Sequence, residues 1–586
     1  MNIQESDILN ILLTNGYTNQ RTLSEISGHS LGIVNRSIKS LMDKGYLDSH
    51  IHLTPKALQE IHANSPKNAI ILAAGFGMRM VPINTEVPKG LLEIHGEPLI
   101  ERIIKQLHEA GIHKIYIVVG FMKEQYEYLM DTYGVELIVN TEYTLKNNLY
   151  SLKSALKYVS NSYIIPCDIW CKNNPFNHYE LYSWYMVSDS MTYGSTVRIN
   201  RKMELVSISD AVKGNEMTGI SYLCNKEAAY VCKRIHFLAS DSRNDNIFWE
   251  DALYQGDKMI VYAKVIHHSE IAEINTYEQL RELDSNSNQL KSETIDIAAK
   301  VLNTTSDKIT DISVLKKGMT NRSFLFKCRS QKYIMRIPGE GTEKLISRSQ
   351  EAQVYHVIKD QHICDDILYI NPCNGYKLTT FFNNARVCNP LNADDVRKCM
   401  LKLRSFHEMD FKVEHKFDLF KQIDFYEHLW NSPSVYKDYN KTKTNILSLR
   451  NYIESQVTKE TLTHIDAVPD NFLFIKTSDS SEEIRLIDWE YAGMQDPHID
   501  IAMFCIYSLY NRQQIDQTIQ FYFTEGCPNA VKIKIYCYIA ACGLLWSNWC
   551  EYKRKLGIDF GEYSLRQYRY AKDYYRLVQN KLNTEG

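Results

Sequence analysis

Several signals that would place a protein in a specialised class are missing from these 586 residues. The 14 cysteines are scattered without a CxxC pair, which is typical of reduced cytoplasmic thiols. The first residues, MNIQESDILN, lack the basic and then apolar run of a signal peptide. No stretch approaches the ~18 to 20 uninterrupted apolar residues that a bilayer span needs. The sequence therefore predicts a cytoplasmic protein that does not enter a membrane.

An excess of positive charge is also missing. The chain has 67 Lys and Arg against 70 Asp and Glu, a net charge of −3, so no global field attracts nucleic acid or anionic lipid. Anionic substrates must therefore be held by local sites. Apolar residues at 44% and charged residues at 23% are ordinary for compact proteins, and the length suggests roughly three to four folding units.

The first segment, residues 1–66, shows short helical periodicities that end in Lys-Gly-Tyr-Leu, and it resembles a winged helix-turn-helix. Its recognition helix, about residues 30–42, carries Asn35, Arg36 and Lys39, which could meet phosphates or base edges of DNA. The segment holds five basic and six acidic residues, so it lacks a basic footprint. DNA binding is therefore a hypothesis beside a structural or partner-binding role.

The second segment, residues 67–283, begins with the apolar run 68–74, which predicts a buried parallel strand that enters a phosphate loop. A helical stretch at 100–110 alternates with apolar strands at 114–119 and 162–166, which predicts a three-layer α/β fold. The polar residues 284–290 predict a linker, and a third domain follows at 291–586.

Glycines follow the first strand of this segment. Gly75 and Gly77 let backbone N–H groups approach a triphosphate, although an ordinary turn between strand and helix would use them too. The segment LAAGFGMRMVPINTEVPKGLLEI, with GFMKEQYEYL and NNLYSLKSAL downstream, resembles the bacterial CTP:phosphocholine cytidylyltransferases. The resemblance implies a Rossmann-like nucleotidyltransferase domain. It also implies that phosphates are held by catalytic Arg79 and Lys89, with further nucleotide contacts at Ala73 and Asn148.

Asp168 stands at the C-terminal end of a predicted strand, where α/β sheets place their ligands. The resemblance implies that Asp168 binds Mg²⁺, which neutralises the pyrophosphate that leaves, although an Asp there can also cap a turn. Asn275 stands where relatives generally have Asp; it can ligate Mg²⁺ through its carbonyl but lacks the charge. Met78 likewise replaces a common Ser or Thr. We expect weaker metal or phosphate binding but retained activity.

A quaternary ammonium group donates no hydrogen bond, so aromatic faces and a carboxylate recognise it. The resemblance places Trp249 and Glu273 where relatives hold the methylated amine, and Tyr193 is a further candidate. Each aromatic residue taken alone is more often part of a core.

The third segment contains HIDAVPDN, in which four residues lie between Asp466 and Asn471, and then Asp488 at a strand end. This order reproduces the catalytic and metal loops of protein-kinase-like enzymes. Asp466 would accept or orient the proton of the substrate hydroxyl, and Asn471 and Asp488 would hold a second Mg²⁺. Asp500 is expected to brace the catalytic loop.

The upstream part of this segment supplies candidates for nucleotide binding. Thr320 and Asn321 lie in a loop that covers the nucleotide but is not a GxGxxG loop. Arg336 stands where protein kinases use lysine, and it resembles choline kinases in having arginine there. Glu351 is its expected ion-pair partner. The alternative for Arg336 and Glu351 is a surface ion pair of little energy.

The segment IDWEYAGMQDPHIDIAMF resembles choline and ethanolamine kinases and, more distantly, aminoglycoside phosphotransferases, which implies a two-lobed kinase-like domain. Glu490 would face the cation of the substrate. Trp546 and Trp549, three residues apart on one helical face, and Tyr568 would form an aromatic wall, although one tryptophan can equally belong to the core.

Together the motifs predict a multidomain α/β and α+β enzyme with two reactions. Choline and ATP give phosphocholine, and phosphocholine and CTP give CDP-choline and pyrophosphate. One alternative is that both domains act on ethanolamine or another amino alcohol. Another is a transcriptional regulator that uses the enzyme-like domains as ligand sensors.

Overall fold

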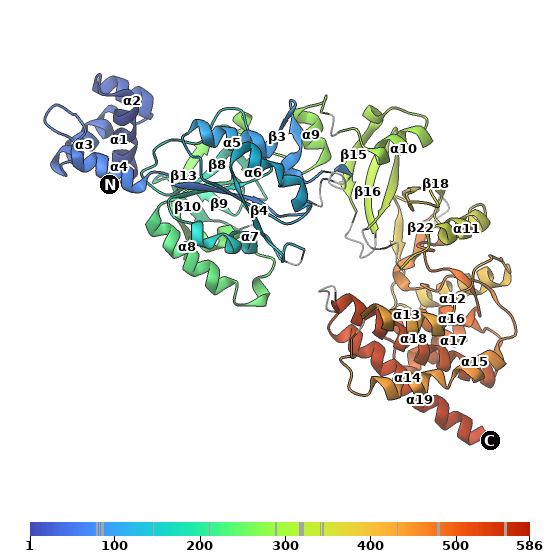
Figure 1. Cartoon of the computed structure of the whole chain (residues 1–586). Coiled ribbons are helices and arrows are strands. Elements are labelled where there is room, and N and C mark those ends of the chain that lie inside the picture. Colours follow the sequence, from blue (N-terminus) through green and yellow to red (C-terminus); the bar gives the residue numbers. More distant parts are fainter. Residues whose placement is uncertain are drawn as a thin grey trace. The chain divides into compact units, whose positions relative to one another are not determined.

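The computed structural model describes residues 1–77, 80, 82, 83, 87–144, 146–209, 211–287, 290–315, 321–339, 342, 345–430, 432–477, 481–555 and 560–585. The chain divides into two compact units, Met1–Glu293 and Thr294–Gly586 (Figure 1). Each unit has hydrophobic cores of its own, and each is described here by itself.

The winged helix-turn-helix predicted for the N-terminal segment is confirmed. Its helices are α1 (Ile3–Asn15), α2 (Gln20–Ser27), α3 (Leu31–Asp43) and α4 (Pro55–Asn64). A bridge between Leu47 and Leu53 forms the wing. The small core includes Leu181 of the following domain, so the winged helix packs directly on the rest of its unit.

The predicted α/β domain is confirmed as a ten-stranded sheet in the order β5-β4-β1-β6-β11-β8-β13-β10-β9, with β12 paired to β13. Its parallel half consists of β1 (Asn68–Ala73), β4 (Ile115–Val119), β5 (Glu136–Val139) and β6 (Ser162–Pro166). The other half is mixed and consists of β8 (Trp184–Thr192), β9 (Val197–Ile199), β10 (Glu204–Ser207), β11 (Gly214–Leu223), β12 (Tyr254–Gln255) and β13 (Lys258–Ile266). Two short hairpin strands, β2 (Glu93–Ile94) and β3 (Glu97–Pro98), precede the first helix of the domain.

Alternate residues of β1 explain the three layers. Ile71 belongs to one core and Ile70 to another, because successive side chains of a strand point to opposite faces. The helices that complete the layers are α5 (Leu99–Glu109), α6 (Tyr128–Tyr133), α7 (Asn148–Ser154), α8 (Asn225–Leu238) and α9 (Tyr277–Leu283).

A separate two-stranded ribbon positions the site of this domain. β7 (Ile169–Cys171) continues from the end of β6 and pairs antiparallel with β14 (Ile271–Glu273). The pairing places the residue before β7, Asp168, beside the residues that follow β14, as the Ile274 N–H to Asp168 carbonyl bond of 2.9 Å confirms.

The second unit has the predicted two-lobed kinase-like fold. After α10 (Glu293–Val301), its first lobe is a five-stranded antiparallel sheet in the order β15-β16-β17-β19-β18 with one helix, α11 (Arg348–Ile358). The strands are β15 (Ile309–Val314), β16 (Asn321–Cys328), β17 (Gln331–Pro338), β18 (Ile367–Ile370) and β19 (Lys377–Thr380).

The second lobe is largely helical. Its helices are α12 (Ala393–Glu408), α13 (Leu419–Trp430), α14 (Tyr439–Leu447), α15 (Arg450–Gln456), α16 (His498–Tyr507), α17 (Arg512–Tyr522), α18 (Asn529–Lys555) and α19 (Glu562–Glu585). Two small sheets carry the active-site loops: β20 (Ala385–Val387) with β22 (Phe472–Lys476) and β23 (Glu482–Leu486), and β21 (Thr461–Thr463) with β24 (Gly493–Gln495).

By length and composition, α18 could cross a membrane. However, 78% of its most apolar 18-residue window is buried within the unit, where α18 packs against α13, α16 and α19. We therefore assign α18 to the core of this lobe.

Candidate active sites

In the first unit, Lys89 joins residues that are far apart in sequence. Its ammonium group forms an ion pair with the Asp168 carboxylate and donates to Asn275 Oδ1 at 2.8 Å. Lys89 begins a short 3-10 helix, Asp168 follows β6 and Asn275 follows β14. The structure thus brings together three predicted site residues at the C-terminal end of the parallel strands, the usual ligand position in such sheets.

The loop after β1 is built close to Lys89. Gly77 has φ 64°, a left-handed conformation that favours glycine, and a Cβ there would lie 3.5 Å from the Lys89 side chain. Ala73 is buried at the end of β1, and Gly75 is exposed to solvent. Arg79 and Met78 lie outside the described residues, so their expected roles stay predictions.

The residues around Asp168 fit a Mg²⁺ ion. Asp168 Oδ1 is buried and has no hydrogen-bond partner within the described part of the chain. Carboxylate and amide oxygens are hard ligands of the type that Mg²⁺ prefers, and Asn275 Oδ1 lies on the same ammonium group. The metal roles of both residues stay predictions.

Asn148 and Trp249 are linked. The Asn148 side chain, at the start of α7, accepts the backbone N–H of Trp249 at 2.9 Å. The Trp249 ring is 1% exposed and packs 6.2 Å from the ring of Tyr185, so it forms part of the core that borders the site. Asn148 thus positions this segment through a direct bond.

Glu250 was not anticipated from sequence. Burial raises its pKa to about 7, and the charges of Asp251 and Glu273 add to the increase. It accepts a hydrogen bond from Tyr185 at 3.2 Å, while its second carboxylate oxygen is buried without a partner among the described residues. Its position directly after Trp249 was the feature of the sequence that could have identified Glu250. Glu273 is exposed at the end of β14, within electrostatic reach of Glu250.

Tyr193 lies in different surroundings. It follows β8, is 65% exposed, and its ring lies under the Lys213 ammonium at 5.0 Å. The contacts of Tyr193 in the described structure do not join it to Lys89, Asp168 or Trp249, and its predicted role stays a prediction.

In the second unit, the catalytic loop is tightly held. Asn471 donates to the Asp466 carbonyl at 2.9 Å and to the Asp466 carboxylate at 3.1 Å. Asp500 on α16 accepts the backbone N–H groups of His464 at 2.9 Å and Ile465 at 2.7 Å, which confirms its bracing role. These two bonds hold Ile465 at φ 67°, a strained conformation for a β-branched residue.

Asp466 is surrounded by negative charge. Its complete burial, together with the nearby carboxylates of Asp488 and Glu490, raises its pKa to about 8. Asp488 follows β23 with φ 68°, and the Ile487 N–H donates to the Asn471 carbonyl at 3.0 Å, which joins the two loops. A divalent cation between Asn471 and Asp488 fits this concentration of negative charge.

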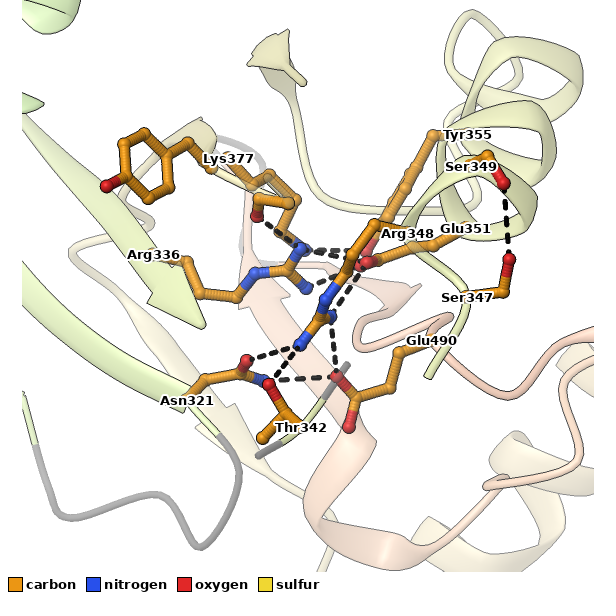
Figure 2. A network of polar contacts seen from close by, with 12 residues as sticks. Asn321, Arg336, Thr342, Ser347, Arg348, Ser349, Glu351, Tyr355, Lys377 and Glu490 are labelled. Atoms are coloured by element: carbon orange, nitrogen blue, oxygen red, sulfur yellow. Dashed lines mark hydrogen bonds and ion pairs between the residues drawn. The ribbon is translucent and has the colours of Figure 1, made fainter. Parts of the chain in front are cut away.

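Arg336 and Glu351 form a buried pair rather than a solvated surface pair (Figure 2). Their side chains are 5% and 0% exposed, and Arg336 Nη2 lies 2.9 Å from Glu351 Oε2 and 2.8 Å from the Gly375 carbonyl. The pair joins β17 to α11, so it fixes the sheet and the helix of the first lobe to each other.

Arg348 was missed from sequence although it occupies the centre of this network (Figure 2). Its guanidinium group donates to Glu351 at 3.0 Å, to Glu490 at 3.2 Å and to Asn321 at 3.2 Å. Asn321 also donates to Glu490 at 3.1 Å. The position of Arg348 three residues before Glu351 on one helix was a usable signal. Thr320 lies outside the described residues.

Glu490 therefore lies inside a polar network. Burial raises its pKa to about 7, and the charge of Asp488 contributes in the same direction. Its predicted contact with a substrate cation stays a prediction.

The residues predicted to form an aromatic wall have two separate sets of contacts. Trp546 and Trp549 lie edge to face with ring centroids 5.2 Å apart, and Phe560 lies 5.0 Å from Trp549. Tyr568 instead stacks on Tyr436 at 3.8 Å and donates to Asp438 and Thr442. The contacts of Tyr568 therefore point to a structural position.

Two tyrosines near Asp466 were not anticipated from the sequence. Tyr563 lies 6.4 Å from Phe560 and 6.2 Å from Tyr507, so rings continue from the tryptophans toward Asp466. Burial raises the pKa of both tyrosines, and the charge of Asp466 contributes. They come from α16 and the start of α19, and their sequence spacing gave no signal for this proximity.

Three family models match the chain. The winged helix-turn-helix DNA-binding model matches residues 1–48, the MobA-like NTP transferase domain residues 69–175, and choline/ethanolamine kinase residues 312–520.

Individual relatives agree with these matches. A choline-phosphate cytidylyltransferase of Streptococcus pneumoniae is 31% identical over 230 residues, which are 37% of this chain and 96% of the relative. A 2-aminoethylphosphonate cytidylyltransferase of Lancefieldella rimae is 30% identical over 233 residues, which cover 37% of this chain and 92% of the relative. The solved structure of choline kinase LicA from Streptococcus pneumoniae is 26% identical and has a TM-score of 0.43, with coverage of 49% of this chain and 99% of that one.

Proposed function

Because the chain belongs to the family of the choline-phosphate cytidylyltransferases and also carries a choline/ethanolamine kinase domain, we propose that it makes CDP-choline in two steps. The observation that supports the proposal is that one chain brings together two separate clusters of predicted site residues, Lys89–Asp168–Asn275 and Asp466–Asn471–Asp488. Phosphocholine, the product of the Asp466 centre, is the substrate of the Lys89 centre.

In the kinase step, the Asp466 carboxylate accepts the proton of the choline hydroxyl as the oxygen attacks the γ-phosphorus of ATP. ADP leaves with the electron pair of the broken P–O bond. Arg336, held by Glu351, is the residue of the first lobe that we expect to position the ATP phosphates. Asn471 and Asp488 would hold Mg²⁺, which supplies positive charge to the phosphates when bound.

In the cytidylyl step, a phosphate oxygen of phosphocholine attacks the α-phosphorus of CTP, and pyrophosphate leaves. Lys89 exchanges its bond to Asp168 for bonds to CTP phosphates, and Asp168 and Asn275 would hold Mg²⁺. Glu250 and Glu273 place carboxylates near the Trp249 segment, where the amine would lie.

Recognition of a methylated amine in the kinase relies on π-faces and negative charge. The rings of Trp549, Phe560, Tyr563 and Tyr507 extend toward Asp466. An aromatic wall favours trimethylammonium over the primary amine of ethanolamine, which prefers hydrogen-bond acceptors. Ethanolamine or another amino alcohol is the alternative substrate. One relative of the cytidylyltransferase domain is named for a different compound, 2-aminoethylphosphonate.

The test incubates the purified full chain with labelled choline, ATP, CTP and Mg²⁺, with ethanolamine in a parallel reaction. We expect phosphocholine first and CDP-choline afterwards, and loss of both when EDTA removes the metal. Accumulation of phosphocholine alone would contradict the second step. Faster turnover of ethanolamine would contradict the choice of choline. Cells keep ATP and CTP in the cytoplasm, so we propose that both reactions take place there.

A second candidate function is DNA binding by the winged helix. Asn35, Arg36 and Lys39 are exposed on α3, while Asp7 of α1 accepts a hydrogen bond from Tyr182 of the neighbouring domain at 3.2 Å. The docked side therefore differs from the side that carries these residues. Fluorescence anisotropy with duplex DNA over a salt series tests this function. Affinity unchanged in Arg36→Ala would argue against contact through α3.

A further inference from the structure

A cluster of metal-ligating side chains lies outside both active centres. Asp189 of β8, with His267 and His268 directly after β13, places one ligand atom from each residue within 4.8 Å of the others. The three residues are exposed, with side-chain exposures of 40%, 55% and 62%. Neither proposed reaction uses them.

The sheet register explains why the three residues meet. β8 and β13 are parallel neighbours, and their last aligned pair is Ser188 with Ile266. Asp189 follows Ser188, and His267 follows Ile266. The register of the two strands therefore makes the carboxylate and the first imidazole neighbours. The backbone N–H of His268 donates to Asp189 Oδ1 at 2.8 Å, which fixes the second imidazole beside the same carboxylate.

The distances match those of ligands around one metal ion. Asp189 Oδ1 lies 3.1 Å from His268 Nδ1, and Asp189 Oδ2 lies 3.5 Å from His267 Nε2. Ligands at ~2.0 to 2.2 Å from a zinc ion in tetrahedral geometry are separated by roughly 3.4 Å. We propose that Asp189, His267 and His268 form a three-ligand site for one divalent transition metal of the Zn²⁺ class.

The donor set decides the class of metal. Two imidazoles with one carboxylate suit Zn²⁺, Ni²⁺ or Co²⁺, whereas Mg²⁺ prefers oxygen ligands. The site is therefore chemically distinct from the oxygen-rich positions at Asp168 and Asp488. Binding releases protons from any imidazole that is charged, because the metal takes the nitrogen lone pair.

The location gives the site a structural consequence. The chain continues from His268 into β14, which pairs with β7 and ends next to Asn275. Within this segment, the Glu270 carbonyl accepts a hydrogen bond from the Lys172 N–H at 2.8 Å. A metal at His267 and His268 ties the beginning of the segment 267–275 to β8.

The first measurement is the Zn²⁺ affinity of the untagged full chain in competition with a chromophoric chelator. We expect one tight site per chain, and a loss of affinity of at least about 100-fold in the double variant His267→Ala/His268→Ala. Asp189→Asn, which keeps the shape, should lose at least about tenfold. Equal affinity in the wild type and the double variant would overturn the proposal.

The matched control is His50→Ala/His52→Ala in the wing. Those imidazoles also lie near a carboxylate, with His52 3.3 Å from Asp48, but among the described residues Asp48, His50 and His52 do not form a group whose ligand atoms all lie within 4.8 Å of one another. We expect Zn²⁺ affinity within about twofold of the wild type, since this arrangement is too open for a three-ligand site.

The second measurement locates the ion. The Co²⁺-loaded protein should show only weak visible bands, without the strong near-ultraviolet absorption of a thiolate ligand from one of the 14 cysteines. Zn²⁺ should also slow amide exchange in residues 267–270 of the wild type and not of the double variant. Strong thiolate absorption, or unchanged exchange in 267–270, would overturn the site.

Discussion

At the residue scale, Asp466 shows how a buried carboxyl group lowers stability. Its folded-state pKa of about 8 lies far above the ~3.9 of an unfolded aspartate. Between these values the folded state keeps a proton that the unfolded state has released, so this carboxyl makes the kinase domain less stable as pH rises from about 4 to 8.

We therefore predict that Asp466→Asn abolishes choline phosphorylation and raises the free energy of unfolding of the kinase domain. The gain should be near zero at pH 4 and on the order of 3 kcal/mol near pH 8 without Mg²⁺. Denaturant unfolding at several pH values measures it. Asp470→Asn, in the same loop, is the control and should keep activity. A gain that does not grow with pH would contradict the proposed proton linkage.

Asn275 is the second residue with a directional prediction. Asn275→Asp adds a carboxylate beside Asp168, so Mg²⁺ should bind more tightly and the concentration needed for half-maximal cytidylyl transfer should fall by about three- to tenfold. Titration of Mg²⁺ in the cytidylyl assay measures this change, and the Mg²⁺ requirement of the kinase serves as the internal control. A higher Mg²⁺ requirement in the variant would show that Asn275 positions Lys89 and does not bind the metal.

Residues in contiguous motifs could be located from sequence, and residues that act across elements could not. Asp466, Asn471 and Asp488 follow the order of a familiar loop, and the structure joins them as that order requires. Tyr507 and Tyr563 meet only because two distant helices pack together. A single sequence carries no record of such packing.

At the element scale, β17 and α11 are joined by a buried charge network. Removal of one partner leaves an uncompensated charge that water cannot reach, which typically costs about 3 to 5 kcal/mol. Glu351 receives both arginines, Arg336 and Arg348, so it is the member whose loss leaves most charge unpaired.

We predict that Glu351→Gln lowers the free energy of unfolding of the kinase domain by about 3 kcal/mol and reduces phosphorylation at least about 100-fold. Cytidylyl transfer should stay at the wild-type rate. Guanidinium unfolding and the two activity assays measure these effects. The exposed pair of Arg404 and Glu408 supplies the control, since Glu408→Gln should change stability by less than about 1 kcal/mol. A similar small effect of Glu351→Gln would contradict a buried role for the network.

Elements differ in how far the sequence could define them. The predicted strand at 162–166 coincides with β6, and the predicted helix at 100–110 lies one residue from α5, because both show clear periodicity. The ribbon of β7 and β14 was not predicted. Its strands have three residues each and are 100 residues apart, and pairing of such short segments depends on tertiary packing.

At the scale of the whole molecule, the two units have separate cores. Among the described residues, the core of the second unit contains none of the first unit, and the cores around the large sheet contain none of the second. Among the described residues, those proposed for each centre come from one unit. We therefore expect each site to form within its own unit.

This independence predicts complementation between two inactive chains. Asp466→Ala should abolish phosphocholine formation and retain cytidylyl transfer from added phosphocholine, while Asp168→Ala should make phosphocholine that accumulates. Because phosphocholine diffuses freely, a mixture of the two variants should restore CDP-choline from choline, ATP and CTP, with a lag that shortens as enzyme concentration rises. Chromatography of labelled products over time measures both the yield and the lag. Loss of both activities in either single variant, or a mixture that makes no CDP-choline, would show that the two centres depend on each other within one chain.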